Sequence, residues 1–123
     1  MTYSLLIVDD NDINLDLLGK ILELEGYRVI KAHDGAEAIR AATQELPDLA
    51  ILDVMMPDID GYELCRKLRQ PPLNLKIPIV MLTAMNSEME RKNALDAGAN
   101  DIWSKPFEMD VFTRRLGKYL KAS

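Results

Sequence analysis

The sequence has few of the features that mark secreted or membrane proteins. It contains one cysteine, Cys65, so no disulfide can form within the chain, and we expect a reducing, cytoplasmic environment. It has no apolar run of the roughly 18 residues that a membrane helix needs. Its N-terminus also lacks the pattern of a signal peptide. We therefore expect no contact with a membrane.

A surplus of positive charge is also missing. The formal net charge is −5, and close basic pairs such as Arg66–Lys67 are isolated within helical patterns. We therefore expect no direct binding of nucleic acid. The single histidine, His33, follows a strand pattern, and we expect it to lie solvated in a loop without a metal.

What the chain does contain is a regular alternation of apolar runs and helical patterns, repeated five times within one expected domain, 1–123. Continuous apolar runs, as opposed to alternating ones, predict strands buried on both faces of a parallel sheet. Joined by right-handed crossovers, such strands give a doubly wound (βα)5, flavodoxin-like α/β sandwich of order 2-1-3-4-5. The expected strands are 4–8, 27–32, 48–52, 77–82 and 101–104.

Three of the expected helices carry recognisable sequence signals. Ser87, with Glu90 three residues later completing a capping box, predicts a capped helix that Gly98 ends. The last helix is expected from Pro106 or about Glu108 onward, to Leu120. The first is expected to end at Gly26, and its apolar residues at helical spacing are Ile13, Leu17, Leu18, Ile21 and Leu22.

Polar residues capable of chemistry follow four of the five strand patterns. They are Asp9–Asp10, Asp53, Thr83 and Lys105. In a sheet of this order, ligands bind beyond the carboxyl ends of the strands, where the first and third strands meet. The predicted fold therefore brings three carboxylates, a hydroxyl and an ammonium together, which describes a metal-dependent phosphoryl site.

Helix capping is a simpler explanation for Asp9 and Asp10, since they precede a helix. Helix capping does not explain Asp53, because Met55-Met56-Pro57 separates it from the next helix. Two carboxylates at ~4 Å repel by about 4 kcal/mol at an effective dielectric near 20, which is large against a domain stability of about 5–15 kcal/mol. A hard divalent cation would offset this repulsion, and an all-carboxylate site favours Mg²⁺ or Mn²⁺.

Together these motifs resemble the receiver domain of two-component response regulators, in a chemotaxis-regulator-like, single-domain form. The match runs in order over essentially the whole chain. The motifs are Asp9–Asp10, Asp53-Val-Met-Met-Pro57 with Asp60–Gly61, Thr83–Ala84, and Lys105-Pro-Phe107.

The resemblance implies that Asp53 accepts a phosphoryl group from the phosphohistidine of a histidine kinase or phosphotransfer protein. It implies Mg²⁺, for which Mn²⁺ can substitute, bound by Asp9, Asp10, Asp53 and the main-chain carbonyl of Met55. Thr83 and Lys105 would contact the phosphoryl oxygens, and the Lys105–Pro106 bond would be cis. Such a chain is a signalling switch and not an enzyme in the usual sense, since it catalyses only its own phosphorylation and dephosphorylation.

One departure concerns the aromatic residue that many relatives place three positions before the lysine. Ile102 occupies that position here, and the aromatic residue is its neighbour, Trp103. Adjacent strand residues point to opposite faces, so Trp103 cannot substitute and is expected in the core. The output is expected to be phosphorylation-dependent association with a downstream protein, or a homodimer, through the face formed by 87–97, 101–104 and 108–120.

Three other functions compete with this interpretation. A phosphatase with an aspartate nucleophile usually needs a second acid two residues later, where this chain has Met55. A flavin-binding electron carrier needs a Ser/Thr/Gly-rich loop after the first strand, where this chain has Asp9-Asp10-Asn11-Asp12. An unphosphorylated interaction module would not need the complete site. The chain ends at Ser123, which leaves no room for an output domain, so we expect a stand-alone regulator or a part of a longer protein.

Overall fold

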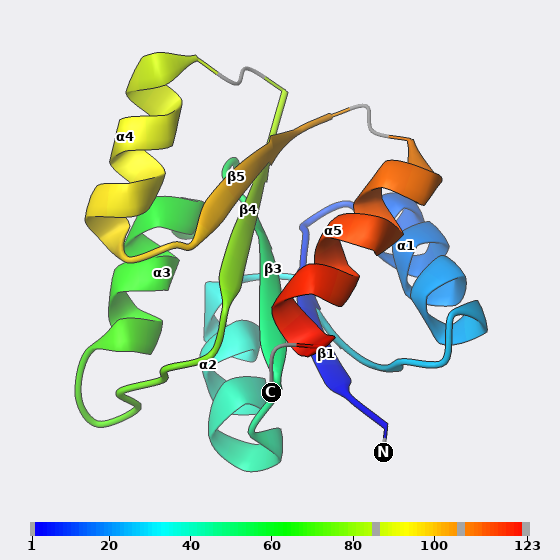
Figure 1. Ribbon diagram of the computed structural model, residues 1–123. Coiled ribbons are helices and arrows are strands. Elements are labelled where there is room, and N and C mark those ends of the chain that lie inside the picture. The colour runs from blue at the N-terminus through cyan, green and yellow to red at the C-terminus, as the bar shows by residue number, and fades with distance from the viewer. Residues whose placement is uncertain (1, 85–86, 106–107, 122–123) are drawn as a thin grey trace.

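Strands and helices alternate along the whole of the computed structural model (Figure 1), which describes residues 2–84, 87–105 and 108–121. The five strands form one parallel sheet in the order β2-β1-β3-β4-β5, as predicted. They are β1 Ser4–Val8, β2 Arg28–Ala32, β3 Leu49–Asp53, β4 Ile79–Thr83 and β5 Asp101–Ser104. The helices are α1 Asp12–Leu24, α2 Gly35–Glu45, α3 Gly61–Arg69, α4 Glu88–Ala97 and α5 Met109–Lys121.

Helices cover both faces of the sheet. Helices α2, α3 and α4 pack on one face, and α1 and α5 pack on the other, as Figure 1 shows. The continuous apolar character of β3 and β4 has its explanation here, since every residue of both strands is buried. Because all strands run in parallel, their carboxyl ends and the loops that follow lie along one edge of the sheet.

The boundaries of three strands differ from the expected ones by one or two residues, and one of them is β3, which runs from Leu49 to Asp53 where 48–52 was expected. Strand β4 begins at Ile79 and not at Ile77, and β2 begins at Arg28 and not at Tyr27. Pro78 has no N–H for a ladder hydrogen bond, although its carbonyl accepts one from the Ala50 N–H at 3.0 Å. The chain therefore joins the sheet only after Pro78, at Ile79.

The helix caps follow the predicted chemistry with one exception. Ser87 Oγ accepts a hydrogen bond from the Glu90 N–H at 3.2 Å, and Gly98 ends α4 in the left-handed conformation with φ of 102°. The only hydrogen bond between Ser87 and Glu90 among the described residues runs to Ser87 Oγ; none returns from the Ser87 N–H to the Glu90 carboxylate, whose Oε2 is buried without a partner. The prediction of a complete capping box was therefore wrong.

The apolar residues of α1 do not all face the core. Leu15 and Leu22 are buried, whereas Ile13 is 78% exposed and Leu17 is 59% exposed. Both exposed side chains belong to the apolar spacing that predicted the helix. Across the ranges that the structure describes, no helix has the length and apolarity to cross a membrane.

Candidate functional site

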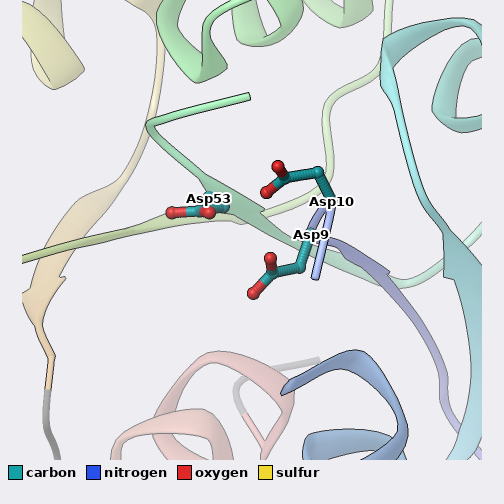
Figure 2. A group of neighbouring side chains, drawn as sticks. All are labelled: Asp9, Asp10 and Asp53. Atoms are coloured by element: carbon teal, nitrogen blue, oxygen red, sulfur yellow. The ribbon is translucent and has the colours of Figure 1, made fainter. Parts of the chain in front are cut away.

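Three carboxylates meet at the edge of the sheet where β1 and β3 end. Asp9 and Asp10 follow β1, and Asp53 is the last residue of β3. One oxygen from each lies within 4.8 Å of the other two, and Figure 2 shows the three side chains together beyond the strand ends. Pairing of β1 with β3 causes this convergence, since Val8 and Leu52 are register partners.

Neither Asp9 nor Asp10 caps helix α1. That role belongs to Asn11, whose side-chain oxygen accepts a hydrogen bond from the Asn14 N–H at 3.0 Å. Asp9 Oδ1 instead accepts a hydrogen bond from the Asn11 N–H at 2.9 Å, which holds the turn between the strand and the helix. Capping therefore does not account for the carboxylates of Asp9 and Asp10.

Asp53 is buried, with 7% of its surface exposed, and it has a cationic partner. Lys105 Nζ lies 3.0 Å from Asp53 Oδ1. The chain places Lys105 there because its N–H donates to the Thr83 carbonyl at 2.8 Å, which continues the pairing of β4 with β5. Thr83, also buried, ends β4 one residue beyond Leu82, the register partner of Asp53.

The electrostatics of the cluster favour a bound cation. The pKa of the Asp9 carboxyl is raised, chiefly by burial. The hydrogen bond from the Asn11 N–H and the charge of Lys105 lower it, whereas repulsion from Asp53 and Asp10 raises it further. Three oxygens of hard carboxylates with one ammonium nearby leave surplus negative charge, and this donor set suits Mg²⁺. The residues present therefore fit the metal that the resemblance implies.

Two apolar side chains close in sequence to the site aspartates are unusually exposed. Met55, in the loop after β3, is 76% exposed, and Ile13, in the first turn of α1, is 78% exposed. The sequence analysis placed Ile13 on the apolar face of the first helix and used only the main-chain carbonyl of Met55, so it did not predict the exposure of either side chain. A signal was available, because α1 carries seven aliphatic residues in its 13 positions, more than one buried face of a helix requires.

His33 is exposed in the bend after β2, as expected, and it has two acidic partners. Its Nε2 lies 2.8 Å from Asp12 Oδ1, and its Nδ1 lies 3.1 Å from Glu37 Oε1. It thus links the first turns of α1 and α2, next to the site but outside the carboxylate cluster. A contact between distant turns depends on tertiary structure, so the sequence alone did not reveal it.

The neighbours Ile102 and Trp103 point to opposite faces of β5, as predicted. Ile102 is buried on the side of α2, α3 and α4, and Trp103 is buried against Phe112 of α5, with ring centroids 5.2 Å apart. The indole Nε1 donates to Asp101 Oδ2 at 2.9 Å, and the Arg115 guanidinium lies 5.6 Å from the ring centroid. The Trp103 ring is therefore held on several sides.

Some predictions concern residues outside the described ranges. Pro106 and Phe107 are among them, and with them the start of the last helix at Pro106 and the cis Lys105–Pro106 bond. The described part of α5 begins at Met109, where the Phe112 N–H donates to the Glu108 carbonyl at 3.0 Å.

Comparisons with known proteins agree with this geometry. The family model of the response regulator receiver domain matches residues 5–117. The alkaline phosphatase synthesis transcriptional regulatory protein PhoP of Bacillus subtilis is 43% identical over 123 residues, which are 100% of this chain and 50% of PhoP. The chain spans about half or less of the length of the curated relatives that it matches.

Solved structures give the same result. The chemotaxis protein CheY4 of Vibrio cholerae is 30% identical with a TM-score of 0.92, and the match covers 98% of this chain and 100% of that one. A two-component response regulator from Clostridium difficile is 30% identical with a TM-score of 0.91, covering 98% of this chain and 97% of that one. The predicted flavodoxin-like fold is confirmed.

Proposed function

Because the chain belongs to the response regulator receiver family, we propose that Asp53 accepts a phosphoryl group from the phosphohistidine of a histidine kinase or phosphotransfer protein. The observation that carries this proposal is the position of the Asp53 carboxylate. It is buried at a strand end, 3.0 Å from Lys105 Nζ, and close to the oxygens of two further aspartates. We assign the receiver function to the whole chain, 1–123.

In the proposed reaction, an oxygen of Asp53 attacks the phosphorus while the bond from phosphorus to the imidazole nitrogen breaks. Lys105 and the Thr83 hydroxyl bind the phosphoryl oxygens, where negative charge increases in the transition state. Asp9, Asp10, Asp53 and the main-chain carbonyl of Met55 would hold Mg²⁺, or Mn²⁺ in its place. When bound, the metal supplies the positive charge that lets a phosphoryl group approach the carboxylates. Catalysis is confined to the chain's own phosphorylation and dephosphorylation.

We assign the docking of the donor protein to the exposed apolar side chains around Asp53. Ile13 follows Asp10 by three residues and Met55 follows Asp53 by two, and both side chains are mostly exposed. Apolar side chains of this kind provide the contact area that a transient complex needs around a buried reactive group.

The output face in this proposal consists of α4, β5 and α5. Arg91 Nη1 of α4 lies 3.3 Å from Asp101 Oδ1 of β5, and Arg115 of α5 lies over Trp103. These residues line a groove of about 490 Å³ across the three elements. A phosphoryl group on Asp53 contacts Thr83 and Lys105, which adjoin this face. These contacts change how the face associates with a downstream protein or a second copy of the chain.

Intact-mass spectrometry after incubation with acetyl phosphate and Mg²⁺ tests the acceptor residue. We expect one phosphoryl group per chain, mapped to Asp53, and none in Asp53→Asn, whose side chain is nearly isosteric. Asp16→Asn, which changes a carboxylate on the surface of α1, should be labelled like the wild type. A full equivalent of phosphate on any other residue of the wild type would refute the assignment.

A further inference from the structure

An apolar groove leads away from the acidic site between α1 and α5. Its volume is about 580 Å³, within the range of small-ligand sites. The two helices lie on the same face of the sheet in Figure 1. The apolar lining comes from Leu17, Leu18, Ile21, Leu82, Ala84 and Met109.

The groove and the site share two charged residues. Asp9 and Lys105 line the groove, and both also belong to the site, since Asp9 is in the carboxylate cluster and Lys105 pairs with Asp53. A molecule with its phosphoryl group at Asp53 can therefore extend its remaining part along apolar walls. A ligand that matches both regions has a phosphoryl group at one end and a short hydrocarbon chain at the other.

We infer that the chain takes phosphoryl groups directly from acyl phosphates that carry a short alkyl chain, in preference to acetyl phosphate. The inference rests on the proposed role of Asp53 as acceptor. Charge complementarity supports it at one end, where Lys105 meets the phosphoryl oxygens, and the apolar lining supports it at the other. An alkyl phosphate ester does not suit the site, because an alkoxide is a much poorer leaving group than a carboxylate.

The reaction is a single group transfer without a redox step. A bond forms between an Asp53 oxygen and phosphorus while the bond between phosphorus and the acyl oxygen breaks. The electron pair of that bond leaves with the acyl group, which departs as a carboxylate, and no proton is transferred. The products are the aspartyl phosphate and the free fatty acid anion.

The test compares the second-order rate constants for phosphorylation by acetyl and butyryl phosphate, with Mg²⁺, by intact-mass spectrometry. Each methylene buried from water is worth up to about fourfold in affinity. Since the groove is open on one side, we expect butyryl phosphate to react about three to ten times faster. Spontaneous hydrolysis of both donors, measured in parallel, corrects for their intrinsic reactivity.

Variants of α1 assign the preference to the groove. Ile21→Ser places a hydroxyl in the wall and should bring the ratio of the two rate constants close to one. Leu24→Ser is the matched control, since Leu24 is on the same helix, 83% exposed and outside the groove. If Ile21→Ser does not fold, Leu17→Gln serves instead, because Leu17 is 59% exposed, and it should lower the ratio at least twofold.

The outcomes separate the inference from the proposed function. Acetyl phosphate labelling of Asp53 with a wild-type ratio of one would overturn the inference and leave Asp53 as the acceptor. So would a ratio that the folded groove variants leave unchanged. Failure of both donors to label Asp53 would overturn both proposals.

Discussion

At the scale of single residues, the site concentrates negative charge that the protein alone compensates only in part. Lys105 is the one cation paired with the three aspartates in the described structure. At ~4 Å, a pair of carboxylates repels by about 1 kcal/mol in water and by about 4 kcal/mol at an effective dielectric of 20. Asp10 is exposed, so the repulsion energy that it contributes lies closer to the value in water.

Asp10→Asn should therefore raise the free energy of unfolding without metal, by about 1 kcal/mol, and raise Tm by several degrees. The same variant should weaken the stabilisation by Mg²⁺, because it removes one anionic ligand. Thermal melts with EDTA and with Mg²⁺ measure both effects. Asp16→Asn, which removes the same charge from the surface of α1, should not raise Tm. A lower melting temperature of Asp10→Asn in EDTA would show that the carboxylates do not repel as argued.

His33 provides a second prediction at this scale. The hydrogen bond to Glu37 raises the pKa of the imidazole, desolvation lowers it, and Asp12 raises it again. The doubly protonated ring can donate to both acids, whereas the neutral ring has one N–H. Because the folded pKa is the higher one, the contribution to stability is complete below the unfolded value of about 6.5 and is lost as pH rises through the folded pKa.

An NMR titration of the His33 ring should thus give a pKa above about 6.5 in the wild type and a lower one in Glu37→Gln. Glu45→Gln, at the opposite end of α2, is the control and should leave the His33 pKa unchanged. An equal pKa in the wild type and Glu37→Gln would show that the contact does not persist in solution.

At the scale of secondary-structure elements, two helical glycines have opposite surroundings. A Cβ added at Gly117, inside α5, would meet no heavy atom within 4 Å apart from its chain neighbours and the nearby backbone of its own helix. A Cβ added at Gly61, the first residue of α3, would lie 2.5 Å from the Asp53 carbonyl oxygen and 2.9 Å from Val54 Cα. Close contact of backbone with backbone thus brings α3 against the strand that carries the proposed acceptor.

Gly117→Ala should stabilise the protein by about 0.5–1 kcal/mol, because alanine loses less backbone entropy in a helix. Gly61→Ala should destabilise it by about 1–3 kcal/mol, since the backbone must move. Urea unfolding of the two variants beside the wild type measures both. A destabilising Gly117→Ala would mean that α5 packs more tightly at this position than the structure shows.

The elements also show how far prediction from sequence extends. The apolar runs and the residues after them sufficed for the sheet order and for the meeting of Asp9, Asp10 and Asp53, because parallel pairing determines both. The exposure of Ile13 and Leu17 was not predicted, because helical spacing alone does not reveal which side of α1 remains uncovered by the sheet and by α5. The partners of His33 and the open half of the capping box likewise depend on how separate elements meet.

At the scale of the whole molecule, the site and the proposed output face are connected through two strands. Thr83 ends β4, Lys105 follows β5, and the Lys105 N–H donates to the Thr83 carbonyl. A phosphoryl group that binds both residues would shift the paired ends of β4 and β5. Ile102 offers no ring that could rotate, so we expect a shift of loops and helices as the response.

Hydrogen exchange with and without beryllofluoride, a phosphoryl mimic, should therefore change in α4, β5 and α5 more than in α2. Light scattering in the same solutions would report association through that face. Asp53→Asn, which cannot bind the mimic in the same way, is the control and should show no change. Identical exchange of α4, β5 and α5 at saturating mimic would rule out this route from site to surface.

The position of Trp103 has a practical consequence for optical spectroscopy. It is the only tryptophan in the chain, and it is 2% exposed between β5 and α5, with Phe112 beside it and the Arg115 guanidinium over the ring. Indole emission depends on polarity and nearby charge, so the wavelength and intensity of this one fluorophore report the docking of a single helix. The protein thus carries an internal probe at the β5–α5 contact, and ligand titrations and stopped-flow kinetics can follow that contact without a label.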